Sequence, residues 1–150
     1  MMAKVNAKRK SRKDTVKEKS VQFYDVPITD VPLTEALVLR QRRDYLRAPI
    51  FMTNVPHLVA FYSVSGYTFG YHGKGPLDLA LNVCEWYLLQ AGYLGARTSH
   101  GLIMKCEQDD YFEVSLALHR DFHAAFIEKV PEEGKTVPFA ELKEWFDNHL

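Results

Sequence analysis

Three glycines within six residues, followed at once by a proline and an apolar helical pattern, constrain this fold more than any other feature. The segment reads YTFGYHGKGP over residues 67–76. Glycine enters positive φ without strain, and proline fits the first turn of a helix. The residues before the glycines are aromatic and typical of strands, so the segment predicts a strand, a tight turn and a helix N-terminus.

The helix expected next, over residues 76–91, is the best-defined element of the sequence. Its apolar side chains repeat at helical spacing: Leu77, Ala80, Leu81, Cys84, Leu88 and Ala91. Gly92 supplies the C′ position that ends it. The stripe is packing material, and we assign no cofactor to it. Because Cys84 lies on the stripe, we expect no disulfide between Cys84 and Cys106.

Around this helix the sequence predicts an α+β fold. Its 150 residues are enough for one domain with its own core. The expected elements are a strand at 21–26, a helix at 33–47, a hairpin of 58–64 with 67–71, a second hairpin of 102–106 with 111–114, a helix at 115–129 and a last helix from Pro138. The 111–114 segment is also compatible with an early start of the helix after it. We therefore expect a single α+β domain over 21–150, in which a small antiparallel sheet packs against the 76–91 helix and two C-terminal helices.

Charge divides the chain into a basic start and an acidic body. Residues 1–20 hold eight basic and two acidic side chains, a charge of +6, which leaves 11 basic and 17 acidic side chains, or −6, for the rest. Such a start cannot bury apolar surface, so we expect residues 1–20 to be a flexible, disordered tail. Its cations can bind phosphates by counterion release, with Lys8, Arg9, Lys10, Arg12 and Lys13 as candidates. A solubilising extension that contacts the acidic body is the alternative.

A second group of cations lies in the C-terminal half of the helix expected at 33–47. It comprises Arg40, Arg42, Arg43 and Arg47. Cations complement the dipole at this end of a helix. A solvated basic face is the simpler interpretation, and a contact with phosphate or with an acidic partner is the functional one.

The Gly-rich turn offers a third binding candidate. Lys74, the free N–H groups at the helix start and the helix dipole can hold an anion, and His72 adds a proton-dependent contact near neutral pH. A structural joint has the same ingredients and is favoured, because a Gly-rich turn alone is a weak signal. On the hairpin expected before the turn, a face with Tyr62, Tyr71, His72 and Lys74 can stack bases or dock a protein. An aromatic-rich core is the alternative.

Two histidines, His119 and His123, lie four residues apart on one face of the helix expected there. This spacing lets a helix offer two nitrogens to one metal, with a third ligand from His100, Cys106 or His72. The first histidine lacks the adjacent glutamate of a zinc protease, so a solvent-facing pair is the simpler interpretation. Nucleophile-elbow, Walker, Cys-x-x-Cys and dinucleotide motifs do not occur in the sequence. We therefore expect a protein that is not an enzyme and has no cofactor.

The turn and the helix after it also carry a resemblance. Residues 70–81, GYHGKGPLDLAL, resemble the signature of domain-of-unknown-function family 6166, an aromatic-Gly-Tyr-Gly-Gly-Ser-Gly-Pro turn that leads into a Leu-Ala-Leu helix. Residues 122–131 and 141–145 are similar to the family's later pattern, an aromatic-basic helix and a short helix with a near-terminal Trp. The resemblance covers about residues 60–92 and 115–150.

Three positions depart from that signature: Phe69, His72 and Lys74 stand where the family has Trp, Gly and Ser. A histidine in place of glycine argues that positive φ is not required at this position, or that a functional group is worth the strain. The resemblance implies a context, bacteriophages and mobile elements, and it implies no activity.

These observations predict a non-catalytic binding protein of phage or mobile-element origin that acts on a nucleic acid or a nucleoprotein complex. The apolar runs are shorter than the ~18 residues of a membrane span, and the basic start lacks the apolar region of a secretory signal. We therefore expect the host cytoplasm and no membrane. One alternative is an anti-defence inhibitor that binds a host protein, such as a CRISPR effector, through its acidic body. Another is a metal-dependent enzyme.

Overall fold

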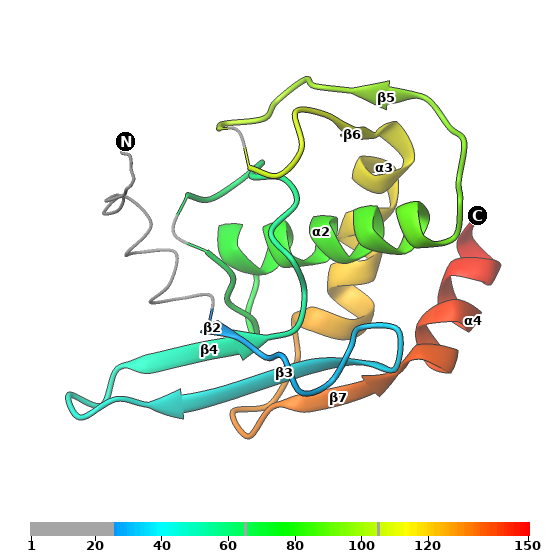
Figure 1. Cartoon of the computed structure of the whole chain (residues 1–150). Helices are drawn as coiled ribbons and strands as arrows, with labels where there is room; N and C mark the ends of the chain where they lie inside the picture. The colour runs from blue at the N-terminus through cyan, green and yellow to red at the C-terminus, as the bar shows by residue number, and fades with distance from the viewer. Residues whose placement is uncertain (1–25, 65, 105) are drawn as a thin grey trace.

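The computed structural model describes residues 26–64, 66–104 and 106–150 (Figure 1). The tail predicted over 1–20 lies outside the described residues, and with it the candidates Lys8, Arg9, Lys10, Arg12 and Lys13. Of the strand expected at 21–26, only Val26 is described. In chain order the elements are β2 (Val26–Pro27), β3 (Ala36–Arg43), β4 (Pro49–Thr53), α2 (Lys74–Gln90), β5 (Arg97–Thr98), β6 (Tyr111–Phe112), α3 (Glu113–Phe122), η1 (His123–Ile127), β7 (Lys135–Pro138) and α4 (Phe139–His149).

Four strands form one sheet in the order β2-β4-β3-β7. β3 is antiparallel to both of its neighbours, with Leu39 opposite Thr53 of β4 and opposite Lys135 of β7. β2 runs parallel to β4, because the chain reverses once before β3 and once after it. The predicted α+β class is confirmed, whereas the sheet, expected to be antiparallel, is mixed.

The helix predicted at 33–47 is wrong, since residues 36–43 form β3. Residues 36–39 are all buried, and a short continuous apolar run fits a buried strand as well as a helix. Pairing with β4 and β7 on both edges favours the strand. The Asn54 side chain supports it further, because it accepts the N–H of Val38 at 3.0 Å and donates to the carbonyl of Ala36 at 2.7 Å.

The helix predicted at 76–91 is confirmed as α2, which begins two residues earlier, at Lys74. It lies at the centre of the molecule in Figure 1 and is buried along most of its length. Three of its buried side chains are polar: Asp78, Asn82 and Glu85. Their spacing of four and three residues places them on one side of the helix, facing chain segments that form little regular structure.

Residues 58–64 were expected to pair with residues 67–71, but the side chains of Asp78 and Asn82 form hydrogen bonds with their backbone instead. The Asp78 carboxylate accepts the backbone N–H groups of residues 61–63 at 2.8–3.0 Å. The Asn82 amide accepts those of residues 58 and 59 and donates to the carbonyl of Val59. The first predicted hairpin is therefore wrong. Side chains of a helix satisfy this backbone, which otherwise would need a partner strand.

Glu85 organises the region of the second predicted hairpin. Its carboxylate accepts hydrogen bonds from the N–H of Phe112, the hydroxyl of Ser115 and the side chains of Arg97 and Gln108. β6 consequently pairs with β5 and not with residues 102–106 as predicted. The chain then enters α3 at once, which is the early helix start that the sequence left open. α3, η1 and α4 confirm the two C-terminal helical segments.

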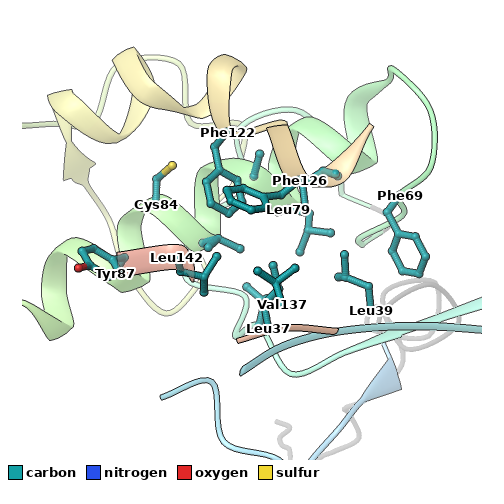
Figure 2. Packing of buried hydrophobic residues seen from close by; sticks show 14 of the residues in the cluster. Leu37, Leu39, Phe69, Leu79, Cys84, Tyr87, Phe122, Phe126, Val137 and Leu142 are labelled. Atoms are coloured by element: carbon teal, nitrogen blue, oxygen red, sulfur yellow. The ribbon is translucent and has the colours of Figure 1, made fainter. Parts of the chain in front are cut away.

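The main core lies between the sheet and the helices, and Figure 2 shows its centre. It includes Leu37, Leu39 and Val137 of the sheet, Leu79 of α2, Phe122 of α3, Phe126 of η1 and Leu142 of α4. The Tyr87 and Phe146 rings stack with centroids 4.0 Å apart. Tyr67 and Phe69, expected on a hairpin, are buried in this core, so an aromatic-rich core explains these two rings. Cys84 and Cys106 are both free thiols, as expected.

Candidate functional site

β3 and β4 continue past the end of the sheet as a two-stranded ribbon. β7 pairs with β3 only as far as Leu39, so β3 from Arg40 onward is paired with β4 alone. We name residues 40–52 the basic ribbon. In Figure 1 it extends from the body on the side away from α4. The four arginines that the sequence placed on a helix lie on this ribbon and the turn that closes it.

The outer face of the basic ribbon is both cationic and apolar. Arg40 lies opposite Met52, and Arg42 lies opposite Ile50. Directly opposite residues of antiparallel strands point to the same face. Both arginines are exposed and both apolar side chains are half-buried. The pairs therefore form a strip on which guanidinium groups stand beside aliphatic side chains.

The tip of the ribbon is a turn held by its own side chains. The Asp44 carboxylate accepts the N–H groups of Leu46 and Ala48 at 2.8 and 2.9 Å. Arg47 has a φ of 67°, in the left-handed region that non-glycine residues seldom adopt. This turn leaves the Tyr45 and Leu46 side chains 90% and 70% exposed. An aromatic ring and an aliphatic chain thus face solvent between the arginines.

Four arginines and one carboxylate give the basic ribbon a formal charge of +3. Arg43 donates to Glu132 at 3.0 Å, an exposed ion pair. Among the described residues, Arg40, Arg42 and Arg47 have no acidic side chain within ion-pair distance. Three of the four arginines on the ribbon thus lack an anionic partner in the part of the chain that the structure describes.

The Gly-rich turn is built as a joint between residues 67–69 and α2. Gly70 has a φ of +92°, and a Cβ there would lie 3.0 Å from the carbonyl oxygen of Val130. A Cβ on Gly75 would overlap Thr68 Oγ1. Gly73, the N-cap of α2, has extended backbone that any residue adopts. A Cβ on Gly73 would lie 2.6 Å from the Tyr71 ring, so all three glycines have close neighbours. This packing supports the joint, and the anion site at Lys74 stays a prediction.

The side chains of Tyr71, His72 and Lys74 are exposed around this turn. Tyr71 shares a hydrogen bond of 2.7 Å with Thr68 Oγ1, and with Arg43 it lines a hollow of about 270 Å³ between the turn and the basic ribbon. His72 and Lys74 do not line it. The predicted stacking face is wrong as a sheet face, because the residues before the turn form no hairpin.

The two helical histidines are buried, so the expectation of a solvent-facing pair is wrong. His119 is 2% exposed; its Nε2 shares a 2.7 Å hydrogen bond with the Tyr62 hydroxyl, and its Nδ1 lies 2.6 Å from the carbonyl of Leu116. Desolvation by burial lowers the pKa of His119, and the charge of Arg120 lowers it further. His119 is thus a neutral core residue that holds Tyr62.

His123 is also 2% exposed, but it faces a different set of groups. Its Nε2 lies 3.2 Å from the carbonyl oxygen of Tyr71, and its Nδ1 lies 3.9 Å from Glu128 Oε1. The His72 ring stands edge-on to it, with centroids 5.2 Å apart. Ligand atoms of His72, His123 and Glu128 all lie within 4.8 Å of one another. Of the third ligands that the sequence offers to the pair of His119 and His123, His72 belongs to this group, whereas His100 and Cys106 do not. His119 itself also lies outside the group.

Comparisons with known proteins add no relative: the chain matches no family model, no curated protein and no solved structure. The resemblance inferred from the Gly-rich turn therefore stays a prediction. Among the helices of the described ranges, none combines the length and apolar character that crossing a membrane requires.

Proposed function

We propose that this protein binds nucleic acid without catalysing a reaction, and that the basic ribbon is its main contact surface. The observation that carries the proposal is a projecting two-stranded ribbon with three arginines that have no acidic partner among the described residues, and with Tyr45 exposed at its tip. An antiparallel ribbon fits the major groove of duplex DNA, and guanidinium groups bind phosphates and guanine edges. An exposed tyrosine can stack on an unpaired base.

The path of the chain supports the same surface. β2 pairs with β4 at Val26 and Met52, and Met52 lies opposite Arg40. Val26, the first described residue, therefore lies beside the basic ribbon. Residues 1–20 carry a charge of +6, so a second basic segment is tethered to the ribbon. The two segments are the cationic parts of an otherwise acidic chain, and cationic segments favour phosphate backbones through counterion release.

Salt-dependent binding of the full chain to labelled duplex DNA tests the proposal. We expect Arg40→Gln and Arg42→Gln each to weaken binding several-fold and to lower the salt slope by about 0.9 for each phosphate that is no longer neutralised. Lys143→Gln is the matched control: it also removes one positive charge, but on α4, away from the ribbon. Deletion of residues 1–20 should weaken binding and flatten its salt dependence. Lys74→Gln in the same assay tests the anion site of the Gly-rich turn.

Two results would overturn the proposal. One is the absence of DNA binding by the intact chain at low salt, where electrostatic attraction is strongest. The other is equal affinity and equal salt slope for the two arginine variants and the Lys143 control. Capture of a stable protein partner by a chain that does not bind nucleic acid would instead support the inhibitor that binds through its acidic body.

A further inference from the structure

We propose that His72, His123 and Glu128 form a binding site for a zinc-class divalent metal ion. The site lies between the Gly-rich turn, which carries His72, and the π-helical turn η1, which begins at His123 and is followed directly by Glu128. It is separate from the basic ribbon and goes beyond the proposed nucleic-acid binding.

The positions of the three groups fit a metal with small adjustments. The ligand atoms lie within 4.8 Å of one another, and bonds of about 2.0–2.1 Å to tetrahedral zinc bring ligand atoms to roughly 3.3 Å. The closing movement falls on His72, which is exposed, and on Glu128, which is half-buried. Both side chains can rotate toward the buried His123 ring, which stays in place.

The hydrogen bond of His123 orients its ring for a metal. The carbonyl oxygen of Tyr71 can only accept, so the Nε2 that lies 3.2 Å from it carries the hydrogen. In the neutral ring Nδ1 is then the unprotonated nitrogen, and it lies 3.9 Å from Glu128 Oε1. Histidines that bind metals commonly donate their other ring N–H to a backbone carbonyl in this way.

The backbone of η1 brings Glu128 to the same side as His123. The N–H of Glu128 donates to the carbonyl of His123 at 2.9 Å, a hydrogen bond across five residues. In an α-helix, at 3.6 residues per turn, side chains five apart would point about 140° away from each other. The wider π-helical turn reduces that angle, and such turns are frequent at functional sites.

Charged groups near the cluster have opposite effects on the binding of a cation. Arg120 and the Glu128 carboxylate both act electrostatically on His123. Arg120 repels a cation, and the Glu128 carboxylate attracts it. Two imidazoles and one carboxylate suit zinc better than magnesium or calcium, and they leave a fourth position for water.

Zinc titration of the full chain, stripped with chelator and followed by calorimetry, tests this site. We expect one zinc per chain, and a loss of affinity of more than about ten-fold in His72→Ala and Glu128→Gln. His100→Ala and Glu133→Gln are matched controls, since they remove an exposed histidine and an exposed glutamate outside the cluster. Zinc should also raise the melting temperature of the intact chain and of the controls, but not of the two cluster variants.

The proposal is overturned if the intact chain binds no zinc or if the cluster variants bind zinc as tightly as the controls do. His72 and Glu128 are exposed or half-buried, so their variants are expected to fold, and their melting curves without metal check this point. Because a chelator removes bound metal, DNA binding measured in its presence does not depend on this site. The two proposals can therefore fail separately.

Discussion

The buried Asp78 side chain accepts backbone hydrogen bonds that a neighbouring strand would otherwise accept. Its carboxylate is fully buried and accepts three consecutive backbone N–H groups, those of Phe61, Tyr62 and Ser63. Burial raises the pKa of Asp78, and the three N–H donors act against that rise. These bonds tie residues 61–63 to α2, and the Tyr62 hydroxyl lies 2.7 Å from His119 Nε2.

Replacing Asp78 by alanine should cost about 3 kcal/mol of unfolding free energy, because three half-buried N–H donors lose their buried acceptor. Asp78→Asn should cost less, since the amide oxygen can still accept, while its NH₂ group meets one N–H donor. Urea unfolding measures both. Asp121→Asn is the control, because Asp121 lies exposed on α3 and its variant should unfold like the parent chain.

His119 predicts a specific dependence of stability on pH. Burial, first, and then Arg120 and His123 lower its pKa from the ordinary value of 6.5, so the folded chain keeps the ring neutral while the unfolded chain protonates it. Stability is therefore complete above about pH 6.5 and is lost as the pH falls through the lowered pKa of the folded chain.

Urea unfolding at a series of pH values checks this expectation. His119→Gln should be less stable than the parent above pH 7, because Tyr62 loses its partner, and its stability should fall less steeply on acidification. His149→Gln, at an exposed histidine on α4, should keep the parent slope. Equal slopes for all three chains would contradict the assignment of a neutral, buried His119.

Elements whose conformation follows from the local sequence pattern could be predicted. Elements whose conformation depends on pairing with distant strands could not. α2 followed from its apolar spacing and from the proline and glycines at its start. β3 was mistaken for a helix because its buried run of residues 36–39 has no clear period and its partners lie in β4 and β7. A signal for the polar side of α2 was present in the sequence, where Asp78, Asn82 and Glu85 recur at helical spacing inside an apolar stretch.

The candidate sites were predictable to a similar degree. The arginines were found as a charged group, but their place on a ribbon depends on the strand pairing of β3. The spacing of His119 and His123 predicts that these two histidines act together, whereas the structure places His123 beside His72 and Glu128. Five-residue spacing across a π-helical turn has no period that a sequence pattern reveals, so the sequence does not predict that Glu128 lies near His123.

Substitutions at Arg47, in the turn of the basic ribbon, distinguish the effect of backbone strain on stability from the effect of the side chain on DNA binding. A left-handed conformation costs a non-glycine residue roughly 1 kcal/mol, so Arg47→Gly should raise the unfolding free energy by up to about that amount. The same variant should weaken DNA binding, because it removes a cation of the ribbon. Arg47→Asn, which tolerates this conformation, should also bind DNA more weakly. Unchanged DNA affinity in both variants would exclude Arg47 from the contact surface.

In the molecule as a whole, the first and last strands of the described chain, β2 and β7, form the two edges of the four-stranded sheet. β3 is closed on one edge by β4 and on the other by β7, where Leu37 lies opposite Val137 and both side chains are buried. The C-terminal residues are therefore part of the core. Position in the sequence alone would not indicate that, since chain ends are commonly dispensable.

Removal of residues 135–150 should abolish soluble expression, because it deletes β7 and α4 and leaves the buried edge of β3 without a partner. The soluble fraction after centrifugation of a cell lysate measures this. Removal of residues 1–20 is the control of similar size, and that chain should stay soluble. A soluble, cooperatively melting chain without residues 135–150 would show that the closure by β7 is not needed.

The position of β7 also has a consequence during synthesis. β3 ends at Arg43 and β7 ends at Pro138, so a ribosome adds 95 residues after completing one strand before the other is available to pair with it. At about 5–20 residues per second this interval lasts roughly 5–20 s. Throughout that time the nascent chain holds an apolar strand with an open edge. Chaperones that bind emerging apolar segments have this long to act on β3, and a ribosome that stalls before β7 leaves a product that cannot close its sheet.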